Sequence, residues 1–209
     1  MYTLFYSPGS ASMLPHLLLR EIGAPHTLHA VDISAGANRS AEYLKLNPAG
    51  VLPTLVIDGK PHAETAALLL MLCERHPEAG LAPAPGAPQR LEFLQGVLHL
   101  ANTLQPAFRL WFYPADLPQA DAAAVKAGVQ SRIESCFTQL DAQLDGRDYL
   151  LGGEQPSALD FYAVMLMRWS RNMPKPATQW PHLKGLADRI RARDSWRKLY
   201  EIEGLTEWA

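Results

Sequence analysis

The chain has 209 residues, of which 48% are hydrophobic and 19% are charged, and its formal net charge is −2. This composition is typical of a soluble globular protein, and the length fits one large domain or two modest ones. Because the sequence has no basic excess, it offers no electrostatic surface for phosphates, and we exclude nucleic-acid binding.

The two cysteines indicate a reducing compartment. Cys73 and Cys136 both lie inside apolar helical patterns, so they are expected to be small buried hydrophobic residues and not a disulfide or a metal site. Residues 1–6 lack the features of a signal peptide, and the longest apolar run, residues 66–73, is far shorter than the about 20 residues that span a bilayer. We therefore expect a cytoplasmic protein with no metal and no membrane partner.

The first 76 residues predict a thioredoxin-like α/β domain. A strand, a helix and a second strand in this short a segment imply a parallel pair joined by a right-handed crossover. The first helix follows a Ser7-Pro8-Gly9 turn, and Ser10 or Ser12 is placed to cap it. The expected elements are strand 2–6, a helix closed by Gly23, strand 27–32, helix 40–46, strand 54–57, strand 61–64 and a helix from Thr65.

The stretch around Pro53 is the most informative part of this half. Pro53 stands at the entry of strand 54–57, and proline is tolerated there because it cannot donate to a ladder. If the Leu52-Pro53 bond is cis, the Leu52 backbone is free to pair with the backbone of a ligand, whereas a trans bond is the commoner state of such bonds. Asp58-Gly59 predicts a hairpin, and Thr65 is expected to cap the next helix, whose start suits a carboxylate.

A proline-rich segment separates two domains. Residues 82–88 contain too many prolines for a helix or a ladder and predict a stiff connector. We therefore predict a thioredoxin-like domain at 1–78, a linker at 79–88 and an all-helical domain at 89–209. In the helix before the linker, Leu68, Met71 and Leu72 form a second apolar face that needs a cover.

The second half shows amphipathic helical segments and no strand pattern. In the first segment, Gln105 interrupts a stripe that includes Leu91, Leu98 and Phe108, and Pro106 predicts a kink. Gln105 is either a buried amide bonded to a neighbour or a residue that faces a wet cleft. The aromatic run at 108–113 is either core or, in part, the wall of an apolar pocket.

A capping box opens the central helix of this half. Ser157 and Asp160 have the spacing at which the two side chains and backbones bond reciprocally at a helix start. The helix that follows, residues 159–171, is too apolar for a surface element, so Asp160 is expected to be structural and not a catalytic acid. The neighbouring helices are predicted at 119–144 and from Pro181.

These patterns together resemble the cytosolic glutathione transferases. The resemblance rests on Asn47-Pro48-x-Gly50-x-x-Pro53, the following hairpin, Glu64-Thr65 and the Ser157 capping box, and it covers essentially the whole chain. It implies a cis bond before Pro53 and glutathione as co-substrate. The implied glutathione contacts are Asn38, Arg39, Val51, Leu52, Pro53, Glu64 and Thr65.

The resemblance also implies where the thiol of glutathione is activated. Tyr6-Ser7-Pro8-Gly9-Ser10 is similar to the start of the serine-type transferases, in which the serine after Pro-Gly donates its hydroxyl to the thiolate. The end of the chain looks most like the bacterial beta class, but that class has a cysteine where Ala11 stands here, so its mixed disulfide with glutathione cannot form. Ser10 is the leading candidate, with Tyr6 and Ser12 as alternatives.

Three functions remain open at this point. The leading hypothesis is conjugation of glutathione to a small electrophilic, partly apolar compound, as in detoxification. The others are a non-catalytic carrier or scaffold of the same fold and, less favoured, a thiol-disulfide oxidoreductase. The resemblance further implies a homodimer, and it places the second-substrate cleft at Gln105, Phe108, Arg109 and Tyr113.

Overall fold

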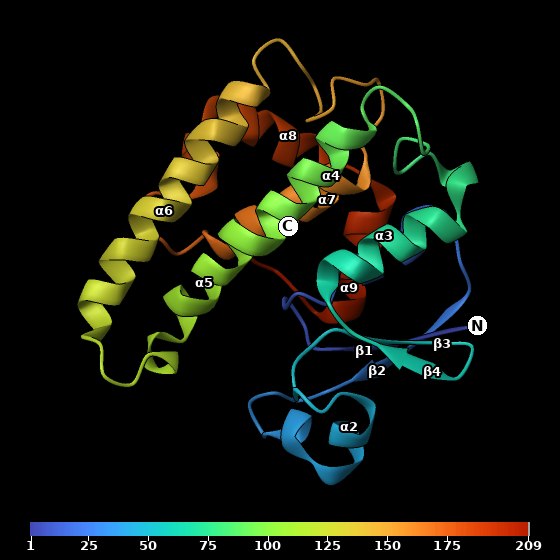
Figure 1. Ribbon diagram of the computed structural model, residues 1–209, viewed down its shortest axis with the longest axis vertical. Coiled ribbons are helices and arrows are strands. Elements are labelled where there is room, and N and C mark those ends of the chain that lie inside the picture. Colours follow the sequence, from blue (N-terminus) through green and yellow to red (C-terminus); the bar gives the residue numbers. More distant parts are fainter. Residues whose placement is uncertain (209) are drawn as a thin grey trace. The chain divides into compact units, whose positions relative to one another are not determined.

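A computed structural model describes residues 1–208 (Figure 1). The chain forms two compact units, one of Met1–Ala82 with the segment from Arg191 onward, and one of Pro83–Ile190. The sequence assigned all of 89–209 to the helical domain. The structure instead groups the C-terminal segment with the first unit, because its helix α9 (Asp194–Glu203) packs against α1 (Met13–Ile22).

The first unit contains a four-stranded mixed sheet in the order β2-β1-β3-β4. Strand β1 pairs in parallel with β2 and antiparallel with β3, and β3 pairs antiparallel with β4. This is the thioredoxin-like outline that the sequence predicts. The remaining elements of this unit are β1 (Tyr2–Tyr6), β2 (His26–Ala30), η1 (Ala37–Arg39), α2 (Ala41–Leu46), β3 (Thr54–Ile57), β4 (Lys60–His62), α3 (Thr65–Arg75) and η2 (Pro77–Ala79).

Local chemistry explains the hairpin between β3 and β4. Asp58 and Gly59 both have positive φ, 50° and 82°, as a tight hairpin turn of the right twist requires. Pro61 lies in β4 at the edge of the sheet, where its missing N–H does not interrupt a ladder. The predicted hairpin is therefore confirmed.

The two helix starts differ from the sequence prediction. Gly23 closes α1 in the left-handed conformation as expected, but Ser12, at the N-cap of α1, makes no capping bond with its side chain. Thr65 is also not a cap, because α3 already begins at Thr65 and Glu64 takes the N-cap position without a capping bond. The hydroxyl groups of Ser12 and Thr65 therefore do not cap these helices and are available for other contacts.

The premise of a second, uncovered apolar face on α3 is wrong. Leu68 and Leu72 are buried within the single chain, and only Met71 of the three remains half-exposed. The chain's own side chains therefore supply most of the cover that the sequence argument sought from a partner.

The second unit is all-helical. Its elements are α4 (Arg90–His99), the π-helical segment η3 (Leu100–Leu104), α5 (Gln105–Phe112), η4 (Pro114–Asp116), α6 (Ala122–Gln143), α7 (Ala158–Trp169), η5 (Ala177–Gln179) and α8 (Pro181–Arg191). Among residues 1–208, no helix is long and apolar enough to cross a bilayer.

The first helix of this unit buries a different face from the predicted one. Leu91 and Leu98 are 67% and 51% exposed, whereas Phe93 and Val97 are buried. Figure 1 shows α4, η3 and α5 as one continuous rod, and the predicted interruption before Pro106 takes the form of the π-helical turn. The π-helical turn rotates the side-chain faces of α5 relative to those of α4.

Helix α7 is the buried centre of this unit, as predicted. All residues from Ala158 to Arg168 are buried. The capping box is present, and the fully buried carboxylate of Asp160 accepts the Ser157 N–H at 2.7 Å and the Leu150 N–H at 2.8 Å. This confirms Asp160 as a structural residue that joins the helix start to the preceding loop.

Candidate active site

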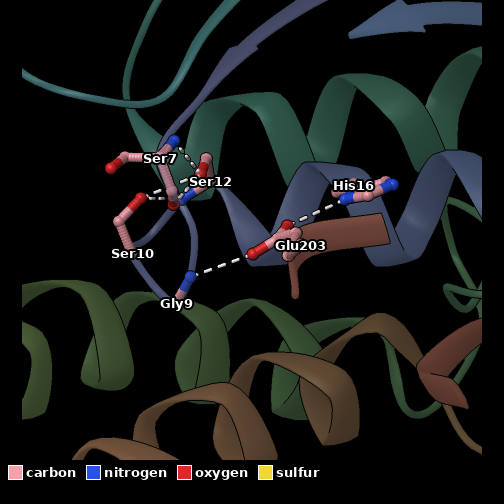
Figure 2. A network of polar contacts seen from close by, with 6 residues as sticks. All are labelled: Ser7, Gly9, Ser10, Ser12, His16 and Glu203. Carbon is pink, nitrogen blue, oxygen red and sulfur yellow. Dashed lines mark hydrogen bonds and ion pairs between the residues drawn. The ribbon is translucent and has the colours of Figure 1, made fainter. Parts of the chain in front are cut away.

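The turn between β1 and α1 carries two of the three candidate hydroxyl groups, those of Ser10 and Ser12, and follows directly after Tyr6. Figure 2 shows Ser7, Gly9, Ser10 and Ser12 on one tight loop. Gly9 has φ of +72°, a conformation that favours glycine, and the Ser10 N–H donates to the Ser7 carbonyl at 3.1 Å. The Pro8-Gly9 turn therefore places residue 10 just before the first turn of the helix.

Ser12 is fully buried and engaged. Its Oγ accepts the Ser7 N–H at 3.2 Å and donates to the Ser7 carbonyl at 3.1 Å. A hydroxyl has a single proton, so Ser12 cannot donate to an external anion without giving up the bond to Ser7. This geometry disfavours Ser12 as the thiol-activating group.

Ser10 is half-exposed, and its Oγ lies 2.8 Å from the Oγ of Ser12. Either hydroxyl is able to donate in this pair; when the Ser12 proton is in the bond to the Ser7 carbonyl, Ser10 is the donor. The Ser12 N–H also donates to the Ser10 Oγ at 3.3 Å. Ser10 must also give up its bond to the Ser12 Oγ to donate to an external anion, but unlike Ser12 it is half-exposed, so its hydroxyl is able to turn toward a ligand.

Tyr6, the third candidate, ends β1 and is half-buried. Burial raises the pKa of its phenol, and the negative charge of Glu203 raises it further. Its hydroxyl therefore stays protonated at neutral pH and is able to donate. The ring centroid of Tyr6 lies 6.1 Å from that of His16.

The loop before β3 is held by side chains of the preceding segment. The amide of Asn38 donates to the Gly50 carbonyl at 2.7 Å, and Arg39 donates to the Ala49 carbonyl at 3.0 Å. Gly50 has φ of +61°, and a Cβ there would lie 2.5 Å from the Arg39 guanidinium. Asn38 and Arg39, which the resemblance assigned to glutathione, thus shape the loop that leads to Val51.

Two residues that the sequence reasoning missed fix the same loop. The Tyr43 hydroxyl donates to the Val51 carbonyl at 2.7 Å, and the Asn47 amide donates to it at 2.8 Å. Asn47 entered the sequence analysis only as part of a motif, and Tyr43 only as an unnamed position of the predicted helix 40–46. The bond between Leu52 and Pro53 is cis, as predicted.

Backbone strain marks the start of α3. Glu64 has φ of +71° and ψ of 105°, which side-chain-bearing residues rarely adopt, while Thr65 beside it is buried. Such outliers concentrate at ligand sites, where the surroundings impose them. The observation agrees with a ligand-holding role for this pair.

The second-substrate candidates lie in the second unit. Gln105 is half-exposed, and its Oε1 accepts the hydroxyl of the buried Tyr162. This bond directs the amide oxygen inward. The amide oxygen of Gln105 is therefore bonded to a neighbour, as in the first alternative, while its place at a wet cleft stays a prediction.

The aromatic run divides between core and surface. Phe108 is fully buried and packs edge-on against Trp169 at 5.8 Å, so it belongs to the core and its assignment to an open cleft is wrong. Tyr113 is 47% exposed and lies under the guanidinium of Arg109 at 4.1 Å. Arg109 also binds Asp116 at 2.6 Å, which lowers the pKa of that carboxyl.

The chain thus joins a thioredoxin-like sheet to an all-helical unit, and this two-part architecture defines the class of protein to which it is similar. Residues 11–75 match the family described as Glutathione S-transferase, N-terminal domain, and residues 122–200 match Glutathione S-transferase, C-terminal domain. The chain belongs to the glutathione S-transferase family.

Proteins similar to this chain match it over nearly its whole length. Glutathione S-transferase GST-4.5 of Xanthomonas campestris pv. campestris is 29% identical, with 97% of this chain and 98% of that protein covered. A sphingomonad glutathione S-transferase solved with glutathione is 31% identical, covers 98% of this chain and 100% of its own, and has a TM-score of 0.85. A beta-class enzyme of Sphingomonas chungbukensis is 28% identical, with 98% and 100% covered and a TM-score of 0.86.

Proposed function

We propose that this chain ionises bound glutathione at Ser10 and adds it to a small, partly apolar electrophile. The observation that carries this proposal is the half-exposed Ser10 hydroxyl, whose neighbour Ser12 has its own proton in the bond to Ser7. The serine-type motif of the sequence and the geometry of the turn thus point to the same residue.

The energetics support a combination of two effects. Lowering the pKa of a thiol by about 2 units takes about 2.7 kcal/mol. A helix N-terminus contributes about 0.3 to 1 kcal/mol, and a hydrogen bond to a charged acceptor about 1.5 to 3 kcal/mol. The start of α1 and the Ser10 hydroxyl together reach the required value, whereas the helix end alone does not.

Conjugation is favoured over disulfide chemistry. Ala11 stands where a beta-class enzyme has its cysteine, and Cys73 and Cys136 are both buried. The two reduced thiols are also in keeping with a cytoplasmic protein.

Glutathione is held, in this proposal, by the first unit. The backbone of Val51 and Leu52 before the cis Pro53 pairs with the cysteinyl part, and Glu64 and Thr65 take the γ-glutamyl end. The strained backbone of Glu64 supports this assignment. Asn38 and Arg39 contact the glycine end while they shape the loop, and Gln105, Arg109 and Tyr113 serve the electrophile.

The test is a titration of the bound thiol. Wild-type protein should be retained on immobilised glutathione and conjugate a general aryl halide, and the thiolate absorbance of its complex should appear below the pH at which free glutathione ionises. Ser10→Ala should raise that midpoint by about 1 to 2 units. Ser131→Ala, an exposed serine of α6, is the matched control.

The alternatives give different results. A shift in Tyr6→Phe with none in Ser10→Ala would move the role to the tyrosine. Retention on glutathione without a depressed thiol pKa and without turnover would make the chain a non-catalytic glutathione carrier.

We further propose a homodimer. The argument from an uncovered face of α3 does not hold. In the single chain, however, Leu91 and Leu98 form an exposed apolar stripe on α4. Scattered exposed leucines are common, whereas two at a spacing of seven lie on one helix face. A monomer mass by light scattering at micromolar concentration would contradict this.

A further inference from the structure

The last residue of α9 reaches the turn that carries Ser10. The Glu203 Oε2 accepts the Gly9 N–H at 2.9 Å, and its Oε1 lies 2.8 Å from the Nδ1 of His16 (Figure 2). The side chains of Glu203 and His16 are both fully buried. Gly9 and Glu203 are 194 positions apart, and both belong to the first unit.

Glu203 stands on the apolar face of its helix. The buried positions of α9 are Ser195, Trp196, Leu199, Tyr200 and Glu203, which recur at helical spacing. A carboxylate on such a face is costly unless hydrogen bonds replace its water. An apolar side chain at this position would pack on α1 without that cost, so packing alone does not account for the carboxylate.

The other end of α9 is fixed to the same helix. Arg193 donates to Glu21 of α1 through two bonds, at 2.9 and 2.6 Å. Contacts at both ends set the register of α9 along α1 and so place Glu203 beside Gly9. The Glu203 carboxylate is therefore held by α9 and does not depend on a flexible tail.

The contact with Gly9 constrains the active-site turn on a second side. Gly9 has φ of +72°, and the next residue is already bonded through its N–H to Ser7. The Gly9 N–H belongs to the Pro8-Gly9 peptide plane, so its bond to Glu203 fixes that plane one residue before Ser10. A rotation of that plane would move the Ser10 Oγ away from the Oγ of Ser12.

The charge of Glu203 does not favour an anion nearby. It contributes to the raised pKa of the Tyr6 phenol, which means that it disfavours a negative charge in this region. Any benefit of Glu203 to a thiolate at Ser10 must therefore come from geometry and must exceed this electrostatic cost.

We propose that Glu203 is a positioning residue for glutathione activation, which holds the Pro8-Gly9 peptide so that the Ser10 hydroxyl is placed to turn toward the thiol. The inference rests on the proposed role of Ser10. It makes the C-terminal helix a part of the activating site, although none of its residues touches the reacting atoms.

Three substitutions separate position from charge. Glu203→Ala removes the acceptor and the charge, and Glu203→Gln removes the charge but keeps an oxygen for the Gly9 N–H. Glu203→Asp keeps the charge and shortens the reach by one methylene, and it serves as the test if the alanine variant does not fold. Glu201→Ala, exposed on the same helix, is the matched control.

The readouts are the thiolate titration of the glutathione complex and the hydrogen exchange of the Gly9 amide. We expect Glu203→Ala to raise the thiol midpoint by about half or more of the Ser10→Ala shift and to speed Gly9 exchange about tenfold or more. Glutathione affinity should stay within about threefold, because the residues of the β3 loop and the α3 start are untouched. Glu203→Gln should titrate at or below the wild-type midpoint.

The outcomes distinguish this inference from the role of Ser10. A shift in Ser10→Ala with none in Glu203→Ala overturns the positioning role and leaves Ser10 in place. A shift in Glu203→Ala with none in Ser10→Ala overturns the role of Ser10 and, with it, the proposal that Glu203 positions the Ser10 hydroxyl. Equal downward shifts in Glu203→Ala and Glu203→Gln would show that Glu203 acts only through charge, and that result also overturns the proposal.

Discussion

Replacing Asp160 by Asn should destabilise the protein far more than the same change at another helix start. Asp160 lies in the capping box of α7, is fully buried and accepts bonds from Ser157 and Leu150. An asparagine retains one acceptor oxygen, but its NH2 group faces a buried donor in place of the second oxygen. One buried N–H is then left without a partner.

The size of the expected stability loss follows from the hydrogen bonds that Asp160 accepts. A hydrogen bond to a charged group contributes about 1.5 to 3 kcal/mol, and a buried donor left unsatisfied costs about 1 to 3 kcal/mol. Burial raises the pKa of the Asp160 carboxyl, although its donors oppose that rise, so the charge itself is costly there and the loss is smaller than the plain sum. We expect a loss of about 2 to 4 kcal/mol, which in a chain of this length lowers the Tm by about 5 to 15 °C.

The assay is urea and thermal unfolding at neutral pH, with Asp121→Asn as the matched control. Asp121 caps α6 from an exposed position, where it accepts the Ala124 N–H at 2.7 Å, and asparagine is an equally good cap in water. The control should therefore leave the Tm nearly unchanged. A loss below about 1 kcal/mol in Asp160→Asn, or equal losses in both variants, would refute the argument from buried donors.

Three further outcomes are expected. Gly96→Ala in α4 should destabilise by about 1 to 3 kcal/mol, because its Cβ would lie 2.6 Å from the buried side chain of Leu159, as checked by urea unfolding. Gly128→Ala in α6 meets nothing within 4 Å and should stabilise by up to about 1 kcal/mol in the same assay; equal effects of the two variants would contradict the steric argument. The phenol of Tyr6 should titrate above the ordinary tyrosine range by ultraviolet difference spectroscopy against Tyr6→Phe, and Glu203→Gln should lower that midpoint because it removes the second cause of the raised pKa. An unchanged midpoint in Glu203→Gln would show that burial alone sets the pKa of Tyr6.

Local sequence determined the elements whose causes lie within a few residues. The Asp58-Gly59 turn, the left-handed Gly23 and the capping box at Ser157 each depend on the conformational freedom of glycine or on a side chain three positions away. The Pro8-Gly9-Ser10 turn belongs to the same group. For this reason the thioredoxin-like outline was predicted in agreement with the structure. The cis Pro53 bond was also predicted, but from the resemblance together with the proline at the strand entry, and the role of the candidate hydroxyl groups stays a prediction.

Tertiary structure decided which of these groups are available and what holds them. Ser12 and Ser10 are equivalent as sequence, but only Ser12 is buried against Ser7, because the turn folds its side chain inward. The burial of Phe108 depends on the packing of three helices, while periodicity indicates only that some face is buried. Glu203 gave no signal because its partner Gly9 is 194 positions away, and a contact over that distance is set by how α9 packs on α1 and by no local pattern.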